Sequence, residues 1–153
     1  MNTTARIEQI WVKRFHRGPM DTVIQATLQI GRGMVGNADQ GGRRQLTIIS
    51  AHRWDLVNKA LKKNLHPSAR RANILVSNME LQETRGRCIR LGPCRLRILG
   101  ETRPCEQMDE SFVGLQAALD KNWGGGAFAE VLTDGIITVG DRAIWEAANR
   151  TVT

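Results

Sequence analysis

The sequence predicts one domain that is mainly β, with its strands wrapped into a distorted closed barrel and a few helices at its periphery. Three observations predict this fold. Short stretches of alternating apolar and polar residues recur along the 153 residues, glycine and proline separate them, and only two stretches have apolar residues at helical spacing. Because a chain of this length buries about two-thirds of its unfolded surface around one core, neither a disulfide nor a metal is needed for stability.

The first strands are predicted in the N-terminal third. Residues 7–13 alternate, with Ile10 and Val12 on one face, and residues 23–30 form the second strand. Residues 31–44 then contain five glycines and three arginines, a composition typical of a loop whose backbone amides can approach a ligand. Residues 45–49 return to a strand.

A helix is predicted at residues 51–63, with Ser50 as its N-cap. Trp54, Val57 and Leu61 fall three and four residues apart and share one face. A short strand at residues 72–77 follows this helix.

Residues 87–91 and 94–99 are predicted to form a hairpin around Gly92 and Pro93. Because side chains alternate along a strand, Cys94 shares a face with Leu96 and belongs in the core. Cys88 falls on the polar face.

The C-terminal third is predicted to contain the second helix, at residues 112–122, with Ser111 as its cap and a run of three glycines after it. Strands at residues 128–132 and 136–139 are predicted to form a hairpin, because Asp134-Gly135 is a strong type I′ turn signal. Residues 143–147 can then close the sheet.

The charge of the chain indicates anionic partners. Its 22 Lys and Arg residues exceed the 15 acidic ones, and only five of the 22 are lysine. Arginine binds phosphate and carboxylate groups bidentately, so a phosphorylated ligand suits this chain. The alternative is a single-stranded nucleic-acid-binding barrel without catalytic activity, which the net charge also fits. The absence of tyrosine and the few other aromatic residues weigh against base stacking.

Three cysteines, an odd number, indicate reduced thiols and predict a cytoplasmic protein. The sequence has no export signal and no apolar run long enough to cross a bilayer, so we expect no membrane association. The cysteines are too far apart for paired zinc ligands, and the histidines form no ligand pair at helical spacing, so no zinc site is expected.

Residues 103–109 contain the leading candidate for chemistry, Cys105. The thiol follows Arg103 and Pro104, so proline stiffens the backbone and a neighbouring cation favours the thiolate. A thiol in this setting can act as a nucleophile, carry a persulfide or bind a soft metal. The alternative is a structural cysteine, because most cysteines perform no chemistry.

Taken in order, several motifs resemble the MOSC domain, which is named for the C-terminal part of molybdenum cofactor sulfurases. The motifs are residues 31–36, 42–49 and 71–74, the Arg103-Pro104-Cys105 segment, and residues 124–126 with Gly140-Asp141. The resemblance extends from about residue 7 to about residue 145. It implies a distorted β-barrel with peripheral helices, and it implies that Cys105 carries sulfur or binds molybdenum.

The resemblance also implies a molybdenum cofactor whose pterin phosphate is bound by Arg43, Arg44 and Arg71, with Asn73 as an amide partner. For these residues the alternatives are a solvated loop and a turn that leads into a strand. The implied partners are a sulfur donor such as a cysteine desulfurase, or a molybdoenzyme acceptor.

The sequence departs from the family pattern in two respects. Residues 36–39 read Gly-Asn-Ala-Asp, where family members often have Gly-Asp-Arg-His, so no role of that histidine is carried over. The chain also lacks the pyridoxal-phosphate domain of the complete sulfurases, and we therefore interpret it as a stand-alone MOSC protein.

Overall fold

The structure, a computed structural model, describes residues 4–104, 108 and 112–147. Its helices are α1 (Ala51–Leu61), the 3-10 helix η1 (Pro67–Arg70) and α3 (Leu115–Leu119). Its strands are β1 (Ile7–Lys13), β2 (Met20–Val23), β3 (Gln25–Gln29), β4 (Gly33–Met34), β5 (Leu46–Ser50), β6 (Ile74–Val76), β7 (Cys88–Leu91), β8 (Cys94–Glu101), β9 (Ala127–Val131), β10 (Gly135–Thr138) and β11 (Ala143–Trp145).

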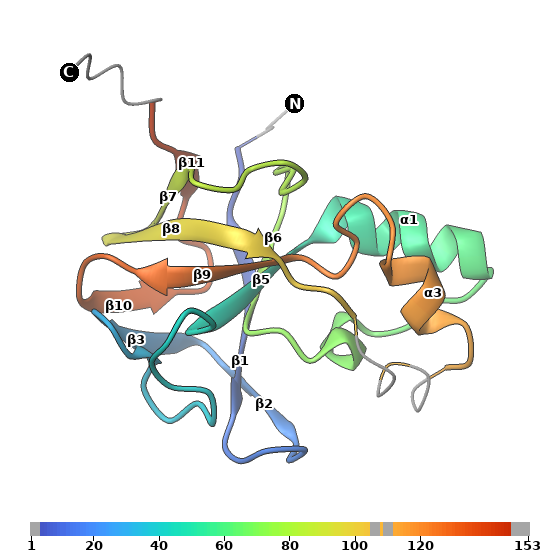
Figure 1. The fold of residues 1–153 in the computed structure, drawn as a ribbon, viewed down its shortest axis with the longest axis horizontal. Coiled ribbons are helices and arrows are strands. Elements are labelled where there is room, and N and C mark those ends of the chain that lie inside the picture. The colour runs from blue at the N-terminus through green and yellow to red at the C-terminus, as the bar shows by residue number, and fades with distance from the viewer. Residues whose placement is uncertain (1–3, 105–107, 109–111, 148–153) are drawn as a thin grey trace.

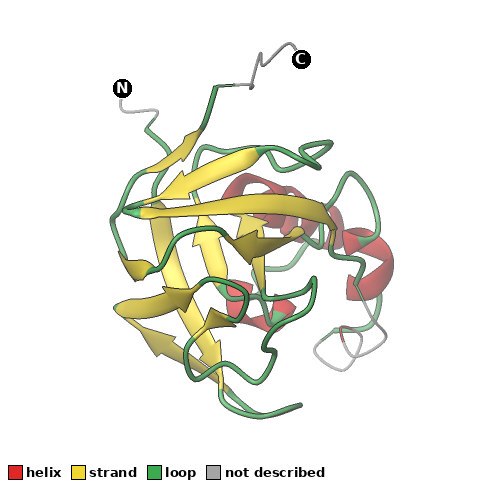
Figure 2. Ribbon diagram, turned by 60° about the vertical axis from the view of Figure 1, so that its left-hand side comes forward, coloured by secondary structure: helices red, strands yellow, loops and turns green. Residues whose placement is uncertain are grey.

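These strands form two sheets, as the mainly β prediction requires. The larger sheet has eight strands in the order β11-β7-β8-β9-β5-β6-β1-β2, and the smaller has the order β10-β3-β4. Among the described strands, only β5 and β6 pair in parallel, through the crossover that α1 provides. Helices α1 and α3 lie together on one side of the strands (Figures 1 and 2).

The predicted closed barrel is not found among the described strands. Residues near β11 approach β1 through an isolated bridge between Arg6 and Arg142 and through backbone hydrogen bonds such as Ala143 N–H to the Ala5 carbonyl, at 2.9 Å. From Ile10 onwards β1 instead pairs with β2. Only the first residues of β1 can therefore pair with the C-terminal segment. The contact between them is a short seam that joins Ala5–Ile7 to Gly140–Ala143 and does not close a barrel.

The predicted hairpin of residues 128–132 and 136–139 is wrong. Strand β9 lies between β8 and β5 in the larger sheet, whereas β10 pairs with β3 in the smaller one. A type I′ turn needs positive φ at both central residues, and neither Asp134 nor Gly135 has it. Asp134 instead accepts a hydrogen bond from the Ile30 N–H at 2.7 Å, so this turn passes the chain from one sheet to the other.

Helix α1 confirms its predicted start. The Ser50 hydroxyl accepts a hydrogen bond from the Arg53 N–H at 3.4 Å. The helix ends at Leu61, two residues before the predicted end, and Lys62 follows it as a cap with a left-handed φ of 55°. The second helix is shorter than predicted, because its described part begins after Gly114 at φ 97°, with no side-chain cap. Ser111, the predicted cap, lies outside the described residues.

The predicted strand at residues 23–30 is interrupted. Strand β2 ends at Val23, and the chain bends at Ile24 before β3 begins in the other sheet. This stretch thus provides the edge strand of the larger sheet, β2, and then the central strand of the smaller sheet, β3.

The main core lies between the two sheets and contains Leu28, Leu96, Ile98 and Cys94, all with no exposed surface. Cys94 is therefore buried as predicted. A second cluster holds the helices together through the buried side chains of Trp54, Val57, Met108, Leu115 and Leu119. Each fully buried Leu or Ile stabilises the fold by roughly 1.5–3 kcal/mol. None of the described helices is long and apolar enough to span a bilayer.

Candidate functional site

A cavity of about 280 Å³ lies where the ends of β1, β5 and β8 meet the segment before β6. We call it the arginine cavity. Its lining comprises Lys13, His16, Asp39, Arg44, Leu46, Thr47, Arg70, Arg71, Asn73, Thr102, Arg103 and Met108. The structure thus brings together four of the residues that the sequence predicted as a site: Arg44, Arg71, Asn73 and Arg103. Arg43 is exposed and does not line the cavity.

Cys105 lies outside the described residues, so its predicted place in the site stays a prediction. Arg103 precedes it by two positions in the sequence and Met108 follows it by three, and both line the cavity. Met108 itself is buried.

Arg71 reaches the cavity because the chain reverses direction at this residue. It follows η1 with a left-handed φ of 63°, and its guanidinium donates a hydrogen bond to the Gly18 carbonyl. Within the part of the chain that the structure describes, Arg71 has no carboxylate partner. Its charge is therefore available to an anionic ligand.

Asn73 is buried, and its side-chain amide joins three segments of the fold. Its Oδ1 accepts from the Thr47 N–H at 3.0 Å, and its Nδ2 donates to the Trp11 carbonyl at 3.2 Å and to Asn37 Oδ1 at 3.0 Å. These contacts fit the alternative interpretation, in which the asparagine satisfies backbone groups. A contact between Asn73 and a ligand stays a prediction.

Arg70 is a wall residue that the sequence analysis missed. It is 6% exposed, and its guanidinium donates to the Gly125 carbonyl at 2.8 Å and to the Thr102 carbonyl at 3.5 Å. It thereby fastens the glycine run to the end of β8. The sequence Arg70-Arg71 does not indicate which of the two guanidinium groups is buried in the protein, because that depends on the turn after η1.

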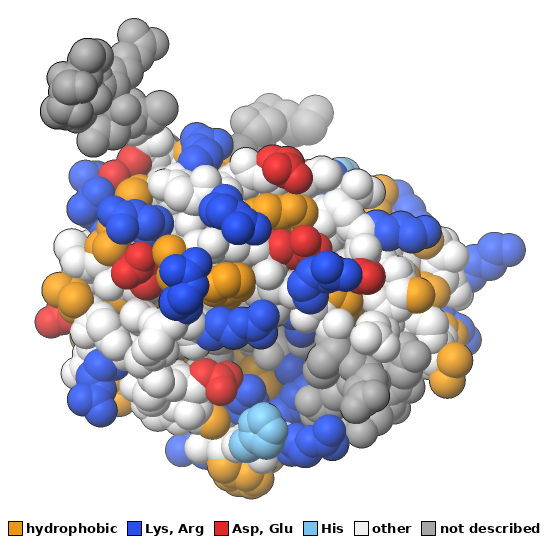
Figure 3. Space-filling model, viewed as in Figure 1, with side chains coloured by type: hydrophobic (Ala, Val, Ile, Leu, Met, Phe, Trp, Pro, Cys, Tyr) orange, Lys and Arg blue, Asp and Glu red, His pale blue; other side chains and the backbone are white. Residues whose placement is uncertain are grey.

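Positive charge dominates the cavity lining, which includes five Lys and Arg side chains and one carboxylate. The carboxylate, Asp39, lies 2.9 Å from Lys13 Nζ. The Arg44 guanidinium lies 5.1 Å from the centre of the Phe128 ring, a cation–π contact that leaves its charge intact. Figure 3 shows many Lys and Arg side chains, with a few Asp and Glu among them, over the region of β8 and β9.

Arg103 has a carboxylate partner that the sequence did not reveal. Its Nε and Nη2 donate to the two oxygens of Asp120 at 2.9 and 3.1 Å, and this bidentate hydrogen bonding raises the pKa of the guanidinium. Asp120 therefore neutralises part of the charge that Arg103 would otherwise direct at an anion or a thiolate.

One polar group in the wall is without a partner among the described residues. The Thr102 hydroxyl is buried and makes no hydrogen bond there. A buried hydroxyl without a partner is costly, so a ligand that accepts a hydrogen bond from Thr102 would remove that cost.

The two described thiols lie away from the cavity. Burial, together with the nearby Asp134 and Asp141 carboxylates, raises the pKa of Cys94, so this thiol stays protonated. Cys88 is half-buried, as predicted. Within the described ranges, no three His, Cys, Asp or Glu side chains form a group that could hold a metal ion.

The MOSC domain family matches residues 12–143. The chain belongs to this family. Its fold is similar to a YuaD protein from Bacillus subtilis, with a TM-score of 0.78, 21% identity and coverage of 92% of this chain and 94% of that one. It is also similar to YiiM from Geobacillus stearothermophilus, with a TM-score of 0.74, 14% identity and coverage of 94% and 75%.

YiiM from Escherichia coli has a TM-score of 0.73 at 13% identity, over 97% of this chain and 73% of that one. No curated protein matches the sequence. At these identities the solved structures show a shared fold and no more.

Proposed function

We propose that this MOSC protein carries sulfur as a persulfide on Cys105 or binds molybdenum through that thiol, beside a cavity that holds the phosphate of the cofactor's pterin. The observation that carries the proposal is the arginine cavity, whose wall includes residues on both sides of Cys105 in the sequence. The MOSC family, named for its cofactor sulfurases, supplies the context.

The described donors fit a phosphate. Arg44 and Arg71 present guanidinium groups without a carboxylate partner among the described residues, and the Thr102 hydroxyl can donate a hydrogen bond. A volume of about 280 Å³ suits a phosphate and the ring next to it, because pockets for whole ligands are usually larger, about 300–1,000 Å³. When bound, the cofactor would supply a thiophilic metal that a cysteine thiolate can bind.

In the sulfur-transfer version, the Cys105 thiolate attacks the outer sulfur of a persulfide on the donor protein. A new S–S bond forms on Cys105, the donor's S–S bond breaks, and the donor leaves as a thiolate, so no external oxidant is needed. The cationic wall favours this step because it stabilises the attacking thiolate over the thiol.

Mass spectrometry after incubation with a cysteine desulfurase and cysteine tests the sulfur version. We expect an adduct of about 32 Da on Cys105 that thiols remove, as they remove a persulfide. Cys105→Ser should abolish it and Cys88→Ser should retain it. The cofactor version predicts bound pterin when the protein is made in cofactor-producing cells. Absence of both the adduct and the pterin would refute the proposal.

Binding of inorganic phosphate, measured by calorimetry, tests the cavity separately. Arg71→Gln should weaken binding about tenfold, because hydrogen bonds to charged groups are worth about 1.5–3 kcal/mol. Arg43→Gln is the matched control, since Arg43 lies outside the cavity lining, and it should bind like the wild type. Equal losses in both variants would show that binding depends on net charge alone.

The rival function, single-stranded nucleic-acid binding, makes a different prediction. Of the seven Phe and Trp side chains, all of which the structure describes, only Phe15 is more than half exposed, so few rings are free for base stacking. An electrophoretic shift at physiological salt that persists in Cys105→Ser would favour the rival.

A further inference from the structure

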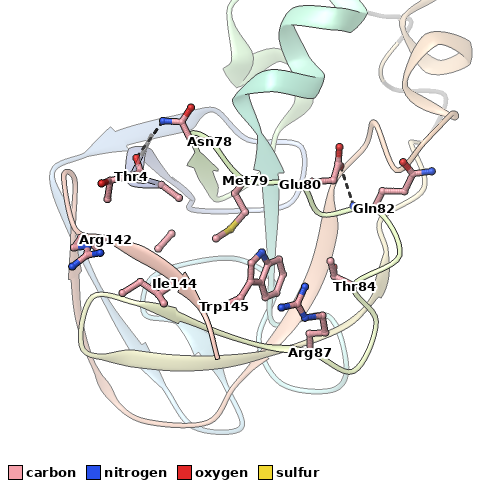
Figure 4. A pocket seen from close by; sticks show the side chains of 12 residues that line it. Thr4, Asn78, Met79, Glu80, Gln82, Thr84, Arg87, Arg142, Ile144 and Trp145 are labelled. Carbon is pink, nitrogen blue, oxygen red and sulfur yellow. Dashed lines mark hydrogen bonds between the residues drawn. The ribbon is translucent and has the colours of Figure 1, made fainter. Parts of the chain in front are cut away.

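A second pocket, of about 600 Å³, opens beside the seam where β1 approaches β11. It shares no lining residue with the arginine cavity. Its walls come from the residues before β1, from residues 78–84 and Arg87, and from residues 142–145 (Figure 4). We call it the seam pocket.

Arg87 is held in place on one side of the seam pocket. Its guanidinium lies over the Trp145 ring, 4.4 Å from the ring centre, and it makes no ion pair with any residue that the structure describes. Stacking fixes the plane of the guanidinium while its N–H groups keep their capacity to donate at the edge. Such an arginine is ready to bind a carboxylate or phosphate bidentately.

Arg142 supplies a second cation on the opposite side of the pocket in Figure 4. Its backbone is fixed by the bridge to Arg6 and by the Gly92 N–H, which donates to its carbonyl at 3.0 Å. Its side chain is exposed and has no carboxylate partner among the described residues. Ile144, 41% exposed, lies between Arg142 and Trp145 in the sequence and adds an apolar surface to the wall.

The pocket's acidic lining residue does not offset these charges. Glu80 lies 2.8 Å from Arg53 Nη2 and also accepts hydrogen bonds from the Leu81 and Gln82 N–H groups, each at 3.0 Å. Its carboxylate is thus already satisfied by Arg53 and by two backbone N–H groups. The pocket keeps two cations, an apolar surface and a volume within the usual range of small-molecule sites.

We propose that the seam pocket binds a small organic anion, whose carboxylate or phosphate is held by Arg87 and whose apolar body lies against Trp145 and Ile144, while Arg142 adds positive charge on the opposite side. A purely apolar ligand would leave the Arg87 guanidinium without an anion. An inorganic ion would leave the apolar surface uncovered. A ligand with both parts satisfies both requirements.

Nuclear magnetic resonance of the tryptophan indole N–H groups, with phenyl phosphate as the probe, tests this proposal. Trp11, Trp54 and Trp123 are buried and Trp145 is half-buried in the pocket wall, so the Trp145 signal, assigned with Trp145→Phe, reports on binding. We expect that signal to shift and saturate with phenyl phosphate, and not with the neutral analogue phenol. Benzoate as a third probe distinguishes a carboxylate site from a phosphate site.

Variants complete the test. Arg87→Gln should weaken phenyl phosphate binding about tenfold, because it removes hydrogen bonds to a charged group. Arg142→Gln should weaken binding less, because it removes only a charge on the opposite side of the pocket, which solvent screens. Arg14→Gln, an exposed arginine at the far end of β1, is the matched control and should bind normally. Arg71→Gln should leave the Trp145 shift intact even though it impairs the arginine cavity. An unshifted Trp145 signal, or equal affinity in Arg87→Gln, would overturn the proposal.

Discussion

Asp120 sets how much of the Arg103 charge reaches the arginine cavity. The two side chains form a bidentate ion pair at the surface, and Arg103 also lines the cavity. Exposed ion pairs of this kind are weak enough to be exchanged for another anion. Asp120 is therefore a competitor for any ligand of Arg103.

We predict that Asp120→Asn tightens phosphate binding by about two- to fivefold, the range that an exposed ion pair can account for. The effect should be absent when Arg103→Ala is already present, because no guanidinium is then released. Calorimetric titration of the two single variants and the double variant measures this coupling. An equal gain in the Arg103→Ala background would mean that Asp120 acts only through net charge.

For single residues, the sequence predicted which side chains belong to the site better than it predicted which way they face. It assigned Arg44 and Arg71 to a phosphate site and Arg103 to the thiolate of Cys105, without showing that they meet, and the structure brings all three to one cavity. It placed Arg43 there as well, although consecutive residues in a loop need not face the same way. Arg70 and Thr102 could not be found from the sequence, because their importance comes from burial, which depends on packing between distant segments.

Among the structural elements, the glycine run after α3 supports the cavity wall. A Cβ atom on Gly125 would lie 2.3 Å from the Thr102 carbonyl oxygen and 3.4 Å from Arg70 Nε. The backbone of this run therefore packs directly against the end of β8, where side chains of any size would force the wall apart.

We predict that Gly125→Ala destabilises the protein by roughly 1–3 kcal/mol, as overpacking usually does, and weakens phosphate binding as well. Denaturant unfolding and calorimetry measure the two effects. Gly31→Asn is the control, because its Cβ meets no atom within 4 Å and asparagine tolerates its φ of 73°. A Gly125→Ala protein of wild-type stability would show that the wall can move.

Glu146 fastens the end of β11 to β8. It accepts two hydrogen bonds from Arg95, and this bonding holds the pKa of Glu146 below its ordinary value of 4.5. Since the folded-state pKa is the lower one, the stabilisation is present above pH 4.5 and is lost as the pH falls through the lowered value.

We therefore predict that wild type is more stable than Glu146→Gln at neutral pH and that the difference shrinks as the pH falls below about 4.5, the ordinary value of a glutamate. Thermal unfolding across this range measures it. A difference that stays constant down to strongly acidic pH would mean that the ionised carboxylate contributes nothing specific.

Helices and strands could be predicted from the sequence wherever a cap residue or the spacing of nearby apolar residues determines them. The Ser50 cap and the face formed by Trp54 and Val57 located α1, and the alternation around Cys94 located β8. The partner of β10 was not predictable, because Asp134 binds the Ile30 N–H, a residue more than a hundred positions away. A local turn signal does not include such a contact.

For the whole molecule, cysteine reactivity gives an overall check. Cys94 has no exposed surface and a raised pKa, whereas Cys88 is half-buried. We predict that iodoacetamide modifies Cys105 fastest, Cys88 more slowly and Cys94 only after unfolding, because the thiolate must be both formed and reachable. Mass mapping of the native protein measures the order. Early modification of Cys94 would contradict the described core.

The seam between β1 and β11 has a consequence for how the chain folds. Strand β1 needs partners from residues 20–23, 74–76 and 140–143, so its hydrogen bonds are complete only after the last of these has been synthesised. Contacts between segments so distant in sequence slow folding, since a long loop must close before they form. During translation the first residues of this strand therefore stay unpaired along one edge until nearly the whole domain has left the ribosome.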